Sequence, residues 1–212
     1  MNHFTFFNAI TDFDRMMGEI GYGFLDSGGD FLNQVFKVIT ILGNGGGVFI
    51  AIGLVMLLFK STRKAGMMSL ISLLIGALIT NIILKYVVAR PRPFWDDTSS
   101  YYTWWVAAGS LAQGGYSFPS GHATAAMAFA FPIFMQFEKK MSWLMLLMAI
   151  IMGFTRIYFQ VHFASDVLIG LIVGVVTGIA AINSVGGLLK INAVKKAFDL
   201  PSILALFKGH VN

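Results

Sequence analysis

Long runs of apolar residues, separated by short charged clusters, dominate the sequence. Five of these runs are candidates for membrane-spanning helices, because a bilayer core of roughly 30 Å needs about 20 apolar residues in a helix. They are residues 48–59, 65–84, 121–137, 141–155 and 167–189. The first run is short, and it crosses a bilayer only if it borrows residues from the glycine-rich turn before it or lets Lys60 extend to the interface.

The first thirty residues follow a different pattern, in which acidic residues interrupt aromatic and aliphatic ones. The acids are Asp12, Asp14, Glu19, Asp26 and Asp30. Such a stretch is typical of an amphipathic helix that lies on a membrane surface. A second short helix is expected over residues 31–42, and the glycine-rich run 43–47 should end it. We therefore expect an all-α integral membrane fold, a helical bundle of five to six transmembrane helices with an N-terminal amphipathic segment.

The chain is expected to form a single membrane-embedded domain over residues 1–212. Within it, residues 1–42 form the amphipathic N-terminal helices, residues 43–189 the transmembrane core with the active site, and residues 190–212 a cytoplasmic tail. Glycines recur every four residues in the last span, at Gly170, Gly174 and Gly178. This spacing predicts close helix packing. Packing within the bundle is the expected use, and a homodimer stays open beside a monomer.

Composition supports this picture and narrows the chemistry. Hydrophobic residues make up 57% of the chain and charged residues 12%, about half the charged fraction of a soluble domain. Cysteine is absent, which excludes a disulfide framework, a thiolate metal site and a cysteine nucleophile. Any chemistry must come from His, Asp, Ser, Lys or Arg. The N-terminus lacks the apolar core and cleavage site of a signal peptide, so the internal spans are expected to drive insertion.

The distribution of Lys and Arg predicts the orientation in the membrane. If the spans alternate, one side receives Lys60, Arg63, Lys64, Lys139, Lys140, Lys190, Lys195, Lys196 and Lys208. This side should be the cytoplasm. The opposite side receives the acidic N-terminal segment, the aromatic loop 90–119 and the turn around His162. We expect a multi-pass protein of a bacterial cytoplasmic membrane.

Four cations do not fit this rule, because Lys85, Arg90, Arg92 and Arg156 belong to the outer side. Ionisable groups placed against the topology are candidates for function. Lys85 and Arg92 are seven residues apart, and we expect them on one face of a helix before Pro91 and Pro93 end it. A basic helix end that reaches lipid phosphates explains this pair equally well.

A second candidate segment opens the apolar run that begins at Gly121. Pro119 and Ser120 are ordinary helix-start residues, so capping alone explains them. The functional reading is that the exposed backbone N–H groups at this helix start, with glycine permitting close approach, bind an anion. Capping does not explain His122 in the first turn.

The third segment carries Arg156, His162 and Asp166. His162 and Asp166 are four residues apart, so their side chains can meet on a helix. A carboxylate beside an imidazole fixes its tautomer and raises its basicity. All three segments end on the same predicted side. The three cations, two histidines and one carboxylate gathered there suit phosphoryl transfer, which needs a clamp for anionic oxygens, a nucleophile and a general acid.

These residues carry a resemblance to a known family. Three segments resemble the three-part signature of the type 2 phosphatidic acid phosphatase (PAP2) superfamily. They are Lys85, six residues, then Arg92-Pro93; Pro119-Ser120-Gly121-His122; and Arg156, five residues, His162, three residues, Asp166. The spacing is intact from Lys85 to Asp166. Thr155 stands where a serine commonly precedes the third-part arginine, and the acidic N-terminus replaces the clear first span of many members.

The resemblance implies a metal-independent integral membrane lipid phosphatase that shares its core fold with vanadium haloperoxidases and uses no cofactor. By that resemblance His162 is the nucleophile, Asp166 orients it, and His122 is the general acid. The phosphate-binding residues are then Lys85, Arg92, Arg156, Ser120 and Gly121. Arg90 occupies a variable position of the signature, and we expect it only to touch a headgroup. Replacement of Arg90 should leave much of the activity.

The expected substrate is a lipid phosphomonoester or diphosphate presented at the outer leaflet, of the undecaprenyl diphosphate, phosphatidylglycerol phosphate or phosphatidic acid type. The residues do not choose among these lipids, and nothing points to nucleic acid as a partner. Two other functions stay open. A lipid phosphotransferase can use the same phosphohistidine. A non-catalytic phospholipid-binding or translocating protein can use the cations only as a clamp, although it would not need both His162 and His122.

Overall fold

The computed structural model describes residues 3–202, and this part of the chain contains helices and no strand. The end of the predicted tail, with Lys208, lies outside the described residues. The main helices are α1 (His3–Leu42), α2 (Gly47–Leu57), α3 (Arg63–Ala77), α4 (Lys85–Val88), α5 (Ser100–Ala107), α6 (Gly121–Gln136), α7 (Lys139–Tyr158), α8 (Ala164–Leu188) and α9 (Asn192–Phe198). The all-α fold predicted from the sequence is confirmed.

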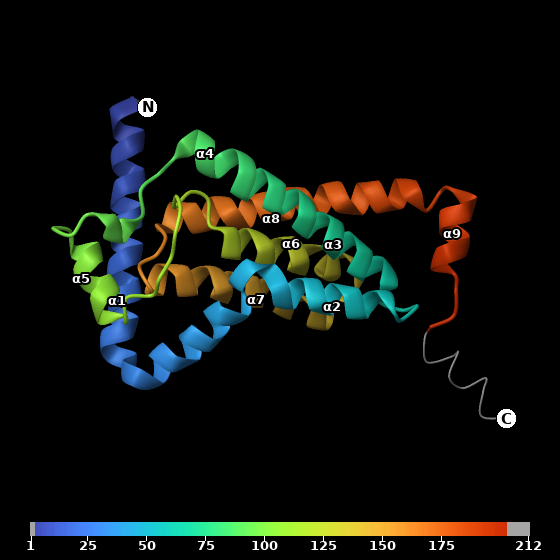
Figure 1. Cartoon of the computed structure of the whole chain (residues 1–212), viewed down its shortest axis with the longest axis horizontal. Helices are drawn as coiled ribbons and strands as arrows, with labels where there is room; N and C mark the ends of the chain where they lie inside the picture. Colours follow the sequence, from blue (N-terminus) through green and yellow to red (C-terminus); the bar gives the residue numbers. More distant parts are fainter. Residues whose placement is uncertain (1–2, 203–212) are drawn as a thin grey trace.

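Helices α2, α3, α6, α7 and α8 run side by side as a bundle (Figure 1). Helix α6 packs against α3, α7 and α8, and its buried positions include the small residues Ala123, Ala126, Ala128 and Ala130. Small side chains allow neighbouring helices to approach closely. The centre of the bundle therefore forms around the helix that begins at the predicted Ser-Gly-His segment.

Three helical segments of the described chain are long and apolar enough to cross a membrane unaided, namely 63–88, 139–158 and 164–188. A bent pair, residues 10–42 and 44–57 with 45° between its two parts, meets the same criterion only as one broken span. Helix α6 has 16 residues, shorter than an ordinary span, but lies inside the bundle. Several helices can therefore span a membrane, as the sequence predicts.

Helix α1 joins the two helices that were expected separately over residues 1–42. A kink at Gly29, with φ 55° and ψ −154°, divides it. The predicted break at 43–47 is confirmed, since Gly45 and Gly46 adopt positive φ values of 60° and 68°. The N-terminal part of α1 crosses one end of the bundle, whereas the part after the kink turns toward α2 (Figure 1). Its location on a membrane surface stays a prediction.

The helix that carries Lys85 ends earlier than expected. Helix α3 continues through a π-helical segment, Leu78–Leu84, into α4, which ends at Val88 because Ala89 takes a left-handed conformation with φ 47°. The prediction that Lys85 and Arg92 share a helix face is therefore wrong. Arg92 reaches the site from extended backbone, with φ −79° and ψ 154°.

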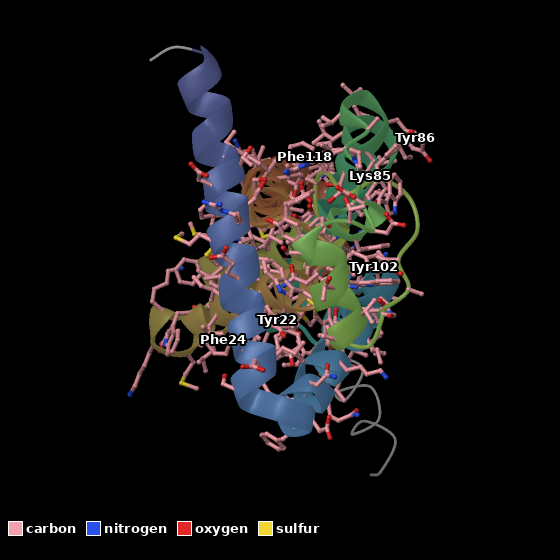
Figure 2. The ribbon with its side chains drawn as sticks, turned by 90° about the vertical axis from the view of Figure 1, so that its left-hand side faces the viewer. Tyr22, Phe24, Lys85, Tyr86, Tyr102 and Phe118 are labelled. Carbon is pink, nitrogen blue, oxygen red and sulfur yellow. The ribbon has the colours of Figure 1, made fainter. Side chains whose placement is uncertain are left out.

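The aromatic loop 90–119 contains a helix that the sequence pattern did not predict. Helix α5 packs against the N-terminal part of α1, with the rings of Tyr22 and Trp104 stacked at 5.5 Å between centroids. The approach is close, because a Cβ atom added to Gly18 would lie 2.7 Å from the ring of Tyr101. Figure 2 looks at this end of the bundle and shows α1 and α5 in front of the helix ends.

The glycines of α8 pack against α6, as expected for packing within the chain. A Cβ atom at Gly170 would lie 2.7 Å from the carbonyl oxygen of Ser120, and one at Gly174 would lie 2.6 Å from the Cβ of Met127. At Gly178 the nearest neighbour is the ring of Phe131, at 2.8 Å. The backbones of the two helices therefore approach more closely than any side chain at these positions would allow.

The far end of the bundle gathers the basic loops of the predicted cytoplasmic side. Arg63 donates hydrogen bonds to the carbonyl oxygens of Phe198 and Leu200, both at 2.9 Å, and the backbone N–H of Lys60 donates to Ser202. These bonds join the α2–α3 turn to the segment after α8. The clusters around residues 60–64 and 190–196 therefore lie at one end, as the sequence predicts.

Candidate active site

A cavity of about 450 Å³ lies where α3, α4 and α6 meet the loop before α8. Four of the predicted site residues line it, namely Lys85, Gly121, His122 and His162. The other four, Arg92, Ser120, Arg156 and Asp166, are buried behind this lining, each with at most 2% of its surface exposed. The three sequence segments therefore meet at one end of the bundle.

His162 lies in the short connection between α7 and α8, one residue before the helix cap Phe163. Its Nε2 is 3.3 Å from Nη1 of Arg92. Because a guanidinium can only donate, Nε2 acts as the acceptor in this contact and carries a lone pair. The proton of the neutral ring then belongs on Nδ1, which faces Asp166.

Asp166 occupies the first turn of α8 and is completely buried. Its Oδ2 lies 3.6 Å from Nδ1 of His162, slightly beyond hydrogen-bond distance. The same oxygen accepts hydrogen bonds from the backbone N–H of Phe163, at 2.9 Å, and from the hydroxyl of Ser117. These donors hold the carboxylate beside the imidazole. A movement of a few tenths of an ångström would complete the hydrogen bond, as is common when substrate binds.

Burial keeps His162 uncharged. It lowers the pKa of His162 to about 3, Asp166 opposes this change, and the nearby positive charges of Arg92 and Arg156 add to it. The imidazole is therefore neutral at every physiological pH, and its Nε2 lone pair is present without any deprotonation.

His122 stands in the first turn of α6 and faces the cavity from the other side. Its Nε2 lies 3.0 Å from Oδ1 of Asn44. Asn44 sits in the glycine-rich turn, whose positive φ angles bring the backbone close to α6; a Cβ atom at Gly43 would lie 2.8 Å from the His122 ring. The sequence identified this turn only as a helix break, so Asn44 was missed.

The two buried arginines are held by different partners. Arg92 donates to the carbonyl oxygens of Gly114, Gly115 and Val161 at 2.7–2.8 Å. Burial lowers the pKa of Arg92 to about 10, with Asp166 opposing, so Arg92 remains positive at neutral pH. Arg156 donates to the side chains of Thr40 and Gln113, and its Nε has no partner within the described residues. Thr40 and Gln113 were not identified from the sequence.

Ser120 and Gly121 form the helix start predicted for the second segment. The Ser120 hydroxyl accepts a weak hydrogen bond from the N–H of Ala123, at 3.4 Å, and its backbone N–H donates to the carbonyl oxygen of Asp166 at 3.0 Å. The second bond ties the start of α6 to the start of α8. His122 at the start of α6 and His162 just before α8 are thereby held in one cavity.

Arg90 differs from the expectation that it would only touch a headgroup. Its guanidinium donates to Asp166 Oδ1 and to Asp14 Oδ2, both at 2.7 Å. It also lies over the ring of Phe163, 3.8 Å from its centroid. Arg90 is therefore part of the support of Asp166, and nothing in the sequence marked it as such.

Away from the polar end, the cavity is lined by apolar side chains from α2, α3 and α6. They include Ile50, Leu70, Leu73, Leu74 and Ala77. Ile50 and Leu74 are 43% and 61% exposed, so this part opens toward the outside of the bundle. A molecule with a charged head and an aliphatic tail fits such a cavity.

The site combines two histidines, a buried carboxylate and several cations at the head of an apolar cavity. These groups are suited to phosphoryl transfer on a lipid. The profile of the PAP2 superfamily matches residues 65–189, and the chain belongs to this superfamily. It is a phosphatase, a hydrolase of phosphoric esters.

Individual relatives agree with this assignment. The chain is 32% identical over 152 residues to an undecaprenyl-diphosphatase of Sulfolobus acidocaldarius, covering 71% of this chain and 70% of the relative. It is 29% identical to phosphatidylglycerophosphatase B of Bacillus subtilis, covering 68% and 70%.

A solved structure supports the fold. The crystal structure of the transmembrane PAP2-type phosphatidylglycerolphosphate phosphatase of Bacillus subtilis matches with a TM-score of 0.63 and 24% identity. The match covers 84% of this chain and 86% of that structure. At this identity the likeness concerns the arrangement of the helices alone.

Proposed function

We propose that this protein hydrolyses a lipid phosphomonoester or diphosphate through a phosphohistidine intermediate on His162. The observation that carries the proposal is the environment of His162. Its Nε2 lone pair faces Arg92 at 3.3 Å, its Nδ1 faces the buried carboxylate of Asp166, and its ring lines the same cavity as His122. A neutral, oriented imidazole beside fixed positive charges is an activated nucleophile for a phosphorus centre.

In the first step, Nε2 of His162 attacks phosphorus and the bond from phosphorus to the leaving oxygen breaks. His122 enters this step protonated on both ring nitrogens, with its Nε2–H donating to Asn44 Oδ1. The Nε2 proton passes to the leaving oxygen, and the imidazole of His122 becomes neutral. The imidazole of His162 becomes positively charged as the new bond forms. Asp166 stabilises that charge, while Lys85, Arg92 and Arg156 stabilise the phosphoryl oxygens.

In the second step, water attacks the phosphohistidine. His122, now neutral, accepts the proton of the water, the bond from Nε2 of His162 to phosphorus breaks, and inorganic phosphate leaves. Both histidines return to their starting states. The helix start supplies the backbone N–H of Gly121 and the hydroxyl of Ser120 to the phosphoryl group, whereas the backbone N–H of Ser120 is already bonded to Asp166.

The apolar part of the cavity supports a substrate with a long aliphatic tail. The names of the relatives point to two such lipids, undecaprenyl diphosphate and phosphatidylglycerol phosphate. We propose that one of these two classes is the substrate, presented at the extracytoplasmic face of a bacterial cytoplasmic membrane. The basic loops at the far end of the bundle support this orientation.

Phosphate release from a panel of detergent-solubilised lipids tests the proposal. The panel contains undecaprenyl diphosphate, phosphatidylglycerol phosphate, phosphatidic acid and a lipid A phosphate, each measured with and without a chelator. We expect release from at least one lipid and the same rate with chelator, because fixed side chains supply the positive charge. Loss of activity on chelation would contradict the metal-independent mechanism.

Labelled substrate separates hydrolysis from the two other functions. Label in free phosphate supports the phosphatase, whereas label in a second lipid would show a phosphotransferase. Absence of both products and of any acid-stable or base-stable phosphoenzyme would leave only a lipid-binding role and overturn the proposal.

A further inference from the structure

Asp14 of α1 is the second carboxylate close to the proposed nucleophile, outside the 65–189 region that defines the superfamily. It is only 2% exposed, although it belongs to the acidic amphipathic segment. Its Oδ1 accepts a hydrogen bond from the backbone N–H of Ser165 at 2.7 Å. Its Oδ2 accepts from the Ser165 hydroxyl at 2.8 Å and from Arg90 at 2.7 Å.

Arg90 links this carboxylate to Asp166. Nη2 binds Asp14, while Nη1 binds Asp166 Oδ1 and the hydroxyl oxygen of Ser165, each at 2.7 Å. The Ser165 hydroxyl thus accepts from Arg90 and donates to Asp14. The result is a chain of charge-assisted hydrogen bonds that runs from α1 through Arg90 to Asp166 and then toward His162.

The charges in this chain explain why two carboxylates are useful. A guanidinium paired with Asp166 alone would neutralise the carboxylate that must stabilise a positive imidazole during the reaction. Asp14 shares Arg90, so the group of Asp14, Arg90 and Asp166 keeps one net negative charge. The bond from Arg90 at Oδ1 and the two donors at Oδ2, Ser117 and the backbone N–H of Phe163, also fix the rotation of the Asp166 carboxylate.

We propose that Asp14 is a positioning residue for phosphoryl transfer, which acts through Arg90 to orient Asp166 and preserve its negative charge for His162. The inference rests on the proposed function. It makes the N-terminal segment part of the catalytic apparatus and not only a membrane-surface helix.

Other contacts hold α1 in place independently of Asp14. The side-chain N–H of Gln160 donates to the carbonyl oxygen of Gly18 at 2.9 Å. A Cβ atom at Gly21 would lie 3.2 Å from the carbonyl oxygen of Ile157. Because these contacts remain when Asp14 becomes an amide, the replacement Asp14→Asn should change the charge without releasing the helix.

The test compares Asp14→Asn with Asp12→Asn in the full-length protein. Asp12 lies two residues away on the same helix and has a side chain 71% exposed, so its replacement removes the same charge away from the site. We expect kcat for phosphate release to fall roughly 10- to 100-fold in Asp14→Asn. KM should stay within about twofold, since the phosphate-binding cations are unchanged. Asp12→Asn should match the wild type.

A second background distinguishes positioning from general damage. If Asp14 acts through Asp166, then Asp14→Asn should cost little further kcat in protein that already carries Asp166→Asn. Independent, multiplying losses would overturn the proposal. So would equal kcat values for Asp14→Asn and Asp12→Asn.

If Asp14→Asn fails to fold, as judged by size exclusion and thermal unfolding, Ser165→Ala decides. It removes the hydroxyl that bridges Arg90 and Asp14 without changing charge, and we expect a kcat about three- to tenfold lower. An unchanged kcat in Ser165→Ala would then overturn the inference. Failure of the proposed function is distinct, because in that case the wild-type protein itself releases no phosphate.

Discussion

The two histidines of the cavity have opposite surroundings. His162 is 2% exposed and lies between Arg92 and the carboxylate of Asp166. Three donors hold this carboxylate in place, namely Arg90, Ser117 and the backbone N–H of Phe163. His122 is 9% exposed, and its Nε2 meets only the neutral amide of Asn44. A nucleophile needs a fixed lone pair and a counter-charge, whereas a general acid and base must gain and lose a proton easily. The difference supports the proposed roles of His162 as nucleophile and His122 as general acid.

The strongest test of this comparison is removal of the nucleophile. His162→Ala should lower kcat by about 10⁶-fold, since the proposed covalent intermediate forms on the imidazole of this residue. The folded state should persist, and phosphate release together with acid-quench and base-quench trapping of phosphoenzyme measures the effect. Wild-type turnover in this variant would show that His162 is not the nucleophile.

Replacement of the orienting carboxylate should have the next largest effect. In Asp166→Asn, kcat should fall by up to about 10⁴-fold, because the amide favours the wrong imidazole tautomer. Asp166 raises the pKa of His162, so its loss lowers that pKa further and leaves the imidazole neutral. The fold-decrease in kcat should therefore be the same from pH 5 to 8, and the low-pH side of the rate profile should not shift. Asp96→Asn, in the exposed outer loop, is the matched control.

Removal of the general acid should depend on the leaving group. His122→Ala should lower kcat by about 10²- to 10⁴-fold on a lipid phosphomonoester, whose alkoxide needs a proton. The p-nitrophenolate group of p-nitrophenyl phosphate leaves without protonation. The rate of the first step with this substrate should therefore fall far less. Equal losses on both substrates would mean that His122 only binds phosphate.

The smallest effect is expected at the partner of His122. Asn44→Ala removes one neutral hydrogen bond, so kcat should fall by about tenfold or less. Asn44→Asp keeps an acceptor but adds a negative charge that favours the protonated imidazole, so its pH profile should move to higher pH. Rates measured from pH 5 to 9 separate the two variants. A profile identical to that of the wild type in Asn44→Asp would remove Asn44 from the comparison.

The sequence predicted the parts of the site that depend on local pattern. The start of α6 at Gly121 and its Ser120 cap follow from capping chemistry. The scarcity of charge made the cations of the outer side visible as candidates. Their gathering at one end follows from the lengths of the spans.

The partners that the sequence missed depend on tertiary contacts. Asp14 and Asp12 have the same chemistry and differ only in which side of α1 they occupy, and only the crossing of α1 over the end of the bundle separates them. The contact of Asn44 with His122 depends on the positive φ angles of the neighbouring glycines, and the sequence pattern does not predict these angles. The early end of α4 at Ala89 could not be anticipated, since left-handed alanine has no sequence signal.

The close contact of α6 and α8 in the middle of the bundle influences the geometry of the site at its end. Gly174 lies about two helical turns, or about 12 Å, from Asp166 along α8. A Cβ atom added to Gly174 would lie 2.8 Å from the backbone nitrogen of Ala128 and 2.9 Å from the carbonyl oxygen of Thr124 in α6. The separation of the helices in the middle of the bundle is thus set by direct backbone contact. His122 lies in the first turn of α6, and His162 lies two residues before α8. A methyl group at Gly174 should therefore increase the distance between the two histidines.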